Sequence, residues 1–231
     1  MAIAKQDVVA TMNYYDDPGD GTPPTPVIAG AKTVVNERPV VGHEVNIRDI
    51  TGDEDKYRLE THGFEFRRHK SAKLDFKNEE ELKHGYFEEM ERLIKDATGA
   101  SRVVIFNHRV RRGPADWHRI GENNTAHRGP LHRVHVDQSY DGAAVVLRWN
   151  LSMADAEPYL RGDARYQIVN VWRPLEAVEQ DPLALAEAGS IAERDLVGAA
   201  ISPHSAFKLP GQRKEGSRQS IEVRALVLFD T

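Results

Sequence analysis

The chain has 231 residues, of which 40% are hydrophobic and 29% charged, and its formal net charge at pH 7 is −5. A chain of this length and composition can bury a sizeable core, so residues 1–231 are expected to form a single domain. The basic residues are scattered, and their one local cluster, at 109–112, is too short for a nucleic-acid-binding surface.

The chain contains no cysteine, which excludes disulfides, thiolate metal sites and cysteine nucleophiles. The first residues lack the long apolar core of a signal peptide, and no apolar run is long enough to span a membrane. A cytoplasmic location is therefore expected.

Short apolar or alternating runs between turn-forming residues predict a chain built mainly of strands. In chain order, strands are expected at 11–15, 40–50, 63–69, 101–108, 133–137, 167–173 and 218–229. Residues 16–26 are dense in glycine, proline and aspartate, so we expect a long loop there.

Helices are expected to flank these strands. The longest is predicted over 78–99, because Asn78 can cap its start and Gly99 can end it. Its buried stripe is expected to consist of Leu82, Tyr86, Leu93 and Ala97. Shorter helices are expected at 141–150, capped by Asp141, and at 154–160, with a helical turn inside 182–200. Such elements favour a mainly β fold, a β-sandwich or jelly roll with flanking α-helices.

A His-x-Asp pair lies on the predicted strand at 133–137. Because side chains alternate along a strand, His135 and Asp137 point to one face, and Val134 and Val136 point to the other. A third ligand is available in His204, within the segment SPHSAF. Two histidines and one carboxylate with open positions form the pattern of non-haem Fe(II) oxygenases. From the His-x-Asp pair alone, an ordinary surface strand is about as probable as a metal site.

His132 lies close to this pair in the sequence. Its strand parity is opposite to that of His135, so we place it outside the predicted metal site.

Arg218 and Ser220 follow His204 at the start of the last predicted strand, Arg218 fourteen residues after the histidine. The planar guanidinium of arginine binds a carboxylate bidentately. Arg218 is therefore predicted to hold the distal carboxylate of a keto acid, with Ser220 donating a second hydrogen bond.

Further polar residues belong to the predicted cofactor site. Arg224 shares the face of Arg218 and could be the anchor instead, while Glu222 is expected to neutralise Arg224 or a substrate group. From the strand at 167–173, either Asn170 or Arg173 could reach the same cavity. The alternative for the face of Arg218 and Arg224 is an ordinary solvent-exposed surface.

Several common catalytic motifs are absent. No Walker loop, no nucleophile elbow and no G-x-G-x-x-G after a strand is present, which argues against a Rossmann-type methyltransferase or dehydrogenase. Two other readings stay open. A metal-dependent hydrolase on a β-barrel scaffold would need a general base beside the metal and would have no use for Arg218. A non-catalytic barrel that binds a small molecule would keep the site without turnover.

Six stretches spread over nearly the whole chain carry a resemblance to a known family. They are NYYDDPGDGTPPTP, THGFEF, TGASRVVIFNH, RGPLHRVHVDQSY, QIVNVWRPL with DPLALAEAGS, and PHSAF with RQSIEVRALVLF. In this order they resemble the hydroxylase/desaturase family of microbial secondary metabolism, which includes a cephalosporin methoxylation component, a fungal gibberellin desaturase and an endoperoxide-forming meroterpenoid oxygenase.

The resemblance implies an oxygenase on a double-stranded β-helix that uses Fe(II), 2-oxoglutarate and O2. Such an enzyme hydroxylates or desaturates a small secondary metabolite through a ferryl intermediate. The metal ligands it implies are His135, Asp137 and His204, and the 2-oxoglutarate anchor is Arg218 with Ser220 beside it. A homodimer is compatible with the family. Candidates to line the substrate pocket are Tyr14, Tyr15, Trp117 and Tyr140.

Overall fold

The chain is divided into two compact units, each assembled from separate stretches of sequence. Met1–Arg67, Arg111–Asp137 and Glu176–Gln219 form the first unit, and Arg68–Val110, Gln138–Leu175 and Ser220–Thr231 form the second. The computed structural model describes residues 5–20, 34–35, 39–72, 76, 80, 82–113, 119–120, 129–192, 194, 202–212 and 218–230.

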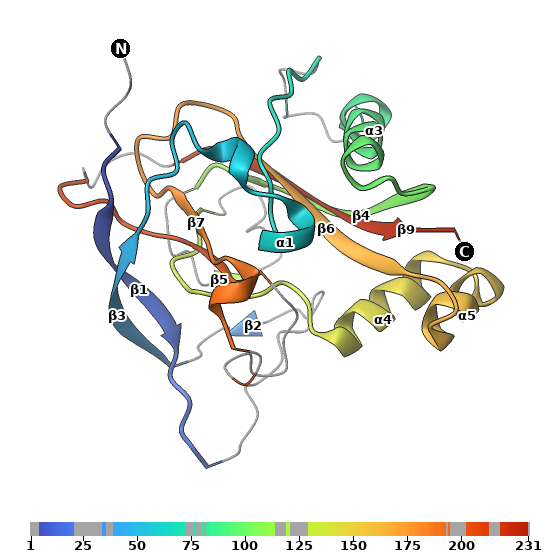
Figure 1. Ribbon diagram of the computed structural model, residues 1–231, viewed down its shortest axis with the longest axis horizontal. Coiled ribbons are helices and arrows are strands. Elements are labelled where there is room, and N and C mark those ends of the chain that lie inside the picture. Colours follow the sequence, from blue (N-terminus) through green and yellow to red (C-terminus); the bar gives the residue numbers. More distant parts are fainter. Residues whose placement is uncertain are drawn as a thin grey trace. The chain divides into compact units, whose positions relative to one another are not determined.

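The first unit is built on antiparallel strand pairs (Figure 1). β1 (Val8–Tyr15) pairs with β3 (Val40–Ile47) over their full length. Two shorter pairs join β2 (Val34–Val35) to β5 (Arg119–Ile120) and β7 (Leu183–Leu185) to β8 (His204–Ala206). The predicted strands at 11–15 and 40–50 are thus confirmed, while β7 and β8 were not predicted. Three-residue strands are too short for a periodic pattern to show.

The core of the first unit forms on one face of β1. Ala10 and Met12 point inward, as alternation along the strand requires, and they pack with Phe207, which follows β8. Val134 packs against this cluster as well. The segment that carries the His-x-Asp pair is therefore seated on the core by its apolar face.

The predicted strand at 63–69 is wrong. A 3-10 turn, η1 (Glu54–Lys56), and a single helical turn, α1 (Leu59–His62), precede it, and Gly63 ends α1 with a positive φ of 80°. The next residues form no ladder. Phe64 instead stacks on the ring of Tyr57 at 5.2 Å between centroids, and Phe66 meets that ring edge-on at 6.1 Å. Ring packing accounts for the alternation that predicted a strand.

The second unit is a three-stranded sheet with helices on both faces (Figure 1). Its strands lie in the order β4 (Arg102–Arg111), β9 (Ser220–Leu228), β6 (Tyr166–Pro174), and β6 and β9 are antiparallel. α3 (Phe87–Thr98) covers one face, whereas α4 (Tyr140–Asn150) and α5 (Met153–Arg161) cover the other. The strands predicted at 101–108, 167–173 and 218–229 are confirmed.

β9 is the central strand of this sheet and is buried on both faces. Ile221, Val223, Ala225 and Val227 pack toward α3, while Leu226 and Leu228 pack toward α4 and α5. By strand parity the polar residues Ser220, Glu222 and Arg224 belong to the second of these faces. Ser220 is 0% exposed and Glu222 7%, so the alternative of an ordinary solvent-exposed face is wrong.

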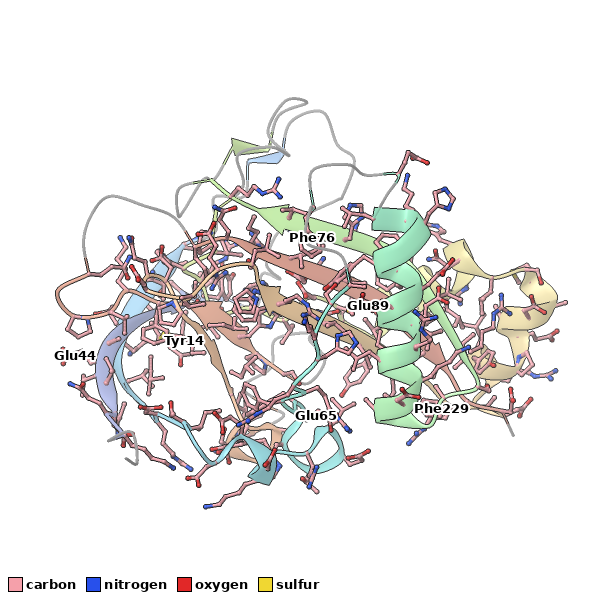
Figure 2. All side chains as sticks on the ribbon, turned by 90° about the horizontal axis from the view of Figure 1, so that it is seen from above. Tyr14, Glu44, Glu65, Phe76, Glu89 and Phe229 are labelled. Carbon is pink, nitrogen blue, oxygen red and sulfur yellow. The ribbon has the colours of Figure 1, made fainter. Side chains whose placement is uncertain are left out.

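The long helix begins as a π-helical turn, η2 (Leu82–Tyr86), and continues as α3 to Gly99, whose φ of 71° ends it as predicted. Its buried stripe is Leu82, Tyr86, Met90 and Ile94. Leu93, predicted for the stripe, is only partly buried. The buried residues follow one another at intervals of four, so Met90 and Ile94 face the core instead. The Phe76 ring meets Tyr86 edge-on at 5.1 Å; Phe76 is labelled in Figure 2. Asn78, the predicted cap, lies outside the described residues.

Serines, not Asp141, cap the two short helices. The Ser139 hydroxyl accepts a hydrogen bond from the Gly142 amide at 3.0 Å, and the Ser152 hydroxyl accepts one from the Asp155 amide at 3.2 Å. Asp141 lies in the first turn of α4, where its charge suits the helix N-terminus. A 3-10 turn at Ala188–Ser190 (η4) matches the helical turn predicted inside 182–200. Within the described part of the chain, no helix has the length and apolar character needed to cross a membrane.

Candidate metal and cofactor site

The candidate metal ligands sit on a small three-stranded arrangement in the first unit, here called the ligand ladder: residues 131–137, β8 and β7. His135 and His204 form an isolated antiparallel bridge, in which each amide donates to the other's carbonyl at 3.1 and 3.0 Å. The Ala206 amide donates to the Leu131 carbonyl at 3.0 Å. The expected strand at 133–137 is thus reduced to one bridge, yet that bridge sets the two histidines side by side.

The two imidazole rings are held in the same way. Nδ1 of His135 lies 2.8 Å from the Arg133 carbonyl, and Nδ1 of His204 lies 3.2 Å from the Ser202 carbonyl. A carbonyl oxygen can only accept, so Nδ1 carries a proton in each ring, and the neutral ring then offers the lone pair of Nε2 to a metal. A backbone hydrogen bond of this kind on the outer nitrogen is a common feature of metal-binding histidines.

Both Nε2 atoms face the carboxylate of Asp137. They lie 3.8 Å from Oδ1 in the case of His135 and 3.9 Å from Oδ2 in the case of His204. One ligand atom from each residue lies within 4.8 Å of the other two. Donors about 2.1 Å from a metal and at right angles to one another are roughly 3 Å apart, so an ion would draw them together by about 1 Å. The donor set therefore fits a divalent metal.

β1 holds the ligand segment from behind. The Val134 amide donates to the Asn13 carbonyl at 2.8 Å, and the Asn13 side-chain amide donates to the His132 carbonyl at 2.7 Å. With the Val134 side chain in the core, the face that carries His135 and Asp137 is turned away from the core. The alternation predicted for this segment therefore survives, although the regular strand does not.

Ser202 is held in a strained conformation beside the site. Its φ is 86°, a region that non-glycine residues rarely adopt, and its hydroxyl donates to the Gly63 carbonyl at 3.0 Å. This backbone conformation presents the Ser202 carbonyl to the ring of His204. Strain of this kind is concentrated at functional sites.

Arg218, the predicted anchor, is buried in the first unit. It is 7% exposed, and its Nη1 donates to the Asp181 carbonyl at 2.6 Å. Ser220, two residues later, is the first residue of β9, and its buried hydroxyl has no hydrogen-bond partner among the described residues. A buried guanidinium and a buried hydroxyl are each the kind of donor that a ligand carboxylate needs.

Sequence reasoning missed Asp181. His132, which it placed outside the metal site, is not among the three grouped ligands. The two residues form a buried pair, with Nε2 of His132 2.8 Å from Oδ1 of Asp181. Asp181 also accepts the hydrogen bond from Arg218 through its main chain. Its position directly before Pro182, in a turn, was the only local signal that could have drawn attention to it.

The other predicted cofactor residues belong to the second unit. Arg224 is paired with Glu222, with 2.6 Å between Nε and Oε1, as expected from their spacing. Asn170 lies opposite Arg224 in the register of β6 and β9 and therefore shares its face. Arg173 points elsewhere: its Nε donates to the Tyr86 hydroxyl at 3.2 Å, and its Nη1 donates to the His69 carbonyl at 2.9 Å. Burial raises the pKa of Tyr86, and the charge of Arg173 opposes that rise.

The four aromatic candidates have different environments. Tyr14, labelled in Figure 2, and Tyr15 are neighbours on β1, so their side chains point to opposite faces. Tyr140, at the start of α4, is 60% exposed. Trp117 lies outside the described residues. Their predicted role as substrate-pocket residues stays a prediction.

Known proteins are similar to this chain in sequence and in fold. Residues 12–202 match the family described as "Oxidoreductase/YMDC permease-like domain". Oxidoreductase AN1597 of Emericella nidulans is 33% identical over 85% of this chain, and the match spans 65% of that protein's own length. Alpha-ketoglutarate-dependent dioxygenase phiK, from a fungal species, is 30% identical over 98% of both chains. Other relatives bear the name hydroxylase/desaturase.

Among solved structures, the iron and alpha-ketoglutarate-dependent endoperoxidase NvfI superposes with a TM-score of 0.78. The superposition covers the whole of both chains at 24% sequence identity, so it shows a common fold. Within this fold, the side chains of His135, Asp137 and His204 lie close enough together to hold a metal ion. The chain belongs to the family of alpha-ketoglutarate (2-oxoglutarate)-dependent dioxygenases.

Proposed function

We propose that this protein binds Fe(II) through His135, Asp137 and His204, binds 2-oxoglutarate through Arg218 and Ser220, and hydroxylates or desaturates a small secondary metabolite. Residues 1–231 would act as a single oxygenase domain on a double-stranded β-helix. The relatives named as dioxygenases and hydroxylase/desaturases support the reaction class. A homodimer remains part of this proposal, and sedimentation analysis would check it.

The observation that carries the metal assignment is the shared orientation of the two imidazoles. Each places its protonated Nδ1 on a backbone carbonyl and turns Nε2 toward one oxygen of Asp137. A histidine pair with a merely structural role has no need to turn two Nε2 atoms toward one carboxylate. Three ligands on one side of the metal would leave positions open for a chelating keto acid and for oxygen.

The protein's own residues position and shield the reactants. When bound, iron and 2-oxoglutarate supply the O2-dependent oxidation of a substrate C–H bond, with release of succinate and carbon dioxide. Arg218 would neutralise and orient the distal carboxylate, and burial strengthens that contact because little water competes for it. The three ligand side chains are mostly buried and keep 11–22% of their surface exposed, and a small molecule would approach the metal from that exposed part.

The test is an anaerobic titration of the metal-free protein with Fe(II) and then 2-oxoglutarate, followed by visible absorption. A charge-transfer band that requires both additions, and that bleaches on exposure to oxygen while succinate forms, is the expected result. Bound metal without such a band would overturn the proposal. It would favour a metal-dependent hydrolase or a binding protein on the same scaffold instead.

A further inference from the structure

Asp181 lies at the centre of a buried polar group in the first unit, here called the Asp181 cluster: Asp181, His132, Gln212 and Arg218. Asp181 is 2% exposed, and its Oδ1 accepts hydrogen bonds from Nε2 of His132 at 2.8 Å and from Nε2 of Gln212 at 2.9 Å. Its amide donates to Oε1 of Gln212 at 3.1 Å. The residue is therefore fixed both by its side chain and by its main chain.

The backbone of Asp181 is strained, and the strain has a visible consequence. Its φ is 47°, and among the described residues only Ser202 shares a positive φ without being glycine. The carbonyl of Ser202 contacts the ring of His204, and the carbonyl of Asp181 contacts the guanidinium of Arg218. Both strained residues thus present a carbonyl to a side chain of the proposed active site. Backbone strain persists only where the surroundings enforce it, and here the bonds from His132 and Gln212 do so.

The cluster also ties Arg218 to the segment that carries the metal ligands. His132 stands three residues before His135, which corresponds to roughly 10 Å along an extended chain. Asp181 is also linked to the metal ligands through the backbone. It lies just before β7, which begins at Leu183 and pairs with β8, and His204 of β8 bridges to His135.

We propose that Asp181 is a positioning residue: it holds Arg218 in place for the distal carboxylate of 2-oxoglutarate, by way of bonds to His132 and Gln212. This inference rests on the proposed function. It assigns Asp181 no contact with the substrate or the metal. Its effect is on the orientation of one guanidinium, so it should change the recognition of the distal carboxylate and leave the binding of the metal unchanged.

The test compares two keto acids in anaerobic titrations of the Fe(II)-loaded protein. 2-Oxoglutarate and 2-oxobutanoate share the chelating keto acid, but 2-oxobutanoate lacks the distal carboxylate. Asp181→Gly keeps the positive φ accessible and removes both side-chain bonds. We expect it to weaken 2-oxoglutarate about tenfold, since a hydrogen bond to a charged group contributes on that order. Affinities for 2-oxobutanoate and for Fe(II) should stay within about twofold.

Asp181→Asn is the matched conservative variant. Asparagine tolerates a positive φ and can still accept from Gln212, so we expect it to retain most of the preference for 2-oxoglutarate. Should Asp181→Gly fail to fold, His132→Asn removes the bond from His132, and Gln212→Ala removes the bonds that the Gln212 side chain makes with the Asp181 carboxylate and amide. Each of these variants should reduce the preference by a smaller factor. Glu89→Gln is the control for stability. Glu89 is a buried carboxylate of the second unit that accepts from Ser71 and Ala72, so its loss should lower the Tm and leave the preference unchanged.

Three results would overturn the inference. If Asp181→Gly binds both keto acids as the unsubstituted protein does, Asp181 does not position Arg218. If it loses both equally, the residue supports the metal site or the fold in general. If the unsubstituted protein shows no Fe(II)-dependent binding of either keto acid, the proposed function itself fails, and the inference fails with it.

Discussion

The ligand ladder and the β6–β9 pair are both antiparallel, yet they are stabilised by different interactions. β7 and β8 have three residues each, and their neighbourhood is fixed by hydrogen bonds among buried polar groups. β6 and β9 have nine residues each, and β9 is buried between helices by apolar side chains on both faces. The candidate metal ligands lie in the short polar ladder, and most of the apolar burial lies in the long sheet.

From this difference we expect ligand binding and stability to depend on different residues. A polar cluster specifies geometry because each bond has a direction, whereas apolar packing contributes free energy in proportion to the area buried. Substitutions in the two regions should therefore separate cleanly into losses of binding and losses of stability.

The largest effect is expected from Asp137→Ala. The substitution removes the one charged ligand, so Fe(II) should no longer bind at stoichiometric concentrations, a loss of more than about 100-fold, because changes to residues that merely support ligands already cost 10- to 100-fold. Metal affinity by anaerobic titration and Tm by calorimetry would be measured together. Unchanged Fe(II) affinity would disprove the metal site, and a Tm close to that of the unsubstituted protein would show that folding does not depend on it.

The converse change is Leu147→Ala in α4. Leu147 is 0% exposed and packs against Leu226 and Leu228, so its truncation should reduce the free energy of unfolding by about 2–5 kcal/mol. Urea denaturation measures that loss. Fe(II) affinity, measured well below the new midpoint, should remain unchanged. A parallel loss of Fe(II) binding would mean that the two regions are energetically coupled.

Substitutions of the two arginines in the C-terminal segment, Arg218 and Arg224, separate an effect on binding from an effect on stability. Arg218→Ala should raise the 2-oxoglutarate concentration needed for half-saturation by about 10- to 150-fold, because a charge-assisted contact of 1.5–3 kcal/mol is lost. Fe(II) binding should be intact.

Arg224→Ala is the matched comparison. It removes the ion pair between Arg224 and the buried carboxylate of Glu222, so it should lower stability and have little effect on the affinity for 2-oxoglutarate. If Arg224→Ala weakens 2-oxoglutarate and Arg218→Ala does not, Arg224 is the anchor.

The smallest effect is expected at Asp49, on the surface of the first unit. Hydrogen bonds from Thr51 and from the Gln6 amide lower the pKa of Asp49 to about 2. Because the folded-state pKa lies below the unfolded value of 3.8, this contribution to stability is present above pH 3.8 and is lost as the pH falls toward 2. Asp49→Asn should therefore slightly reduce the free energy of unfolding at pH 7. Near pH 2 the difference in unfolding free energy between the variant and the unsubstituted protein should be smaller. Urea denaturation at both pH values would check this, and an equal difference at both would contradict it.

The longer elements could be predicted because their signals are local. Alternating or apolar runs placed β1, β3, β4, β6 and β9, and Gly99 marked the end of α3. The failures have physical causes. Phe64 and Phe66 alternate as in a strand, but they pack on the ring of Tyr57, which lies outside the periodic run. A serine two residues before Asp141 supplied the cap of α4, because its hydroxyl reaches the Gly142 amide.

The sequence alone was enough to predict which residues could bind the metal and the cosubstrate, because the His-x-Asp alternation and the Arg-x-Ser spacing are local. How these residues are held in place depends on the tertiary structure. It paired His135 with His204 through one bridge, turned Arg173 toward Tyr86, and connected His132 to Asp181, 49 residues further along the chain. Such contacts depend on which distant segments share a core and a hydrogen bond, and no periodic pattern along the chain encodes that choice.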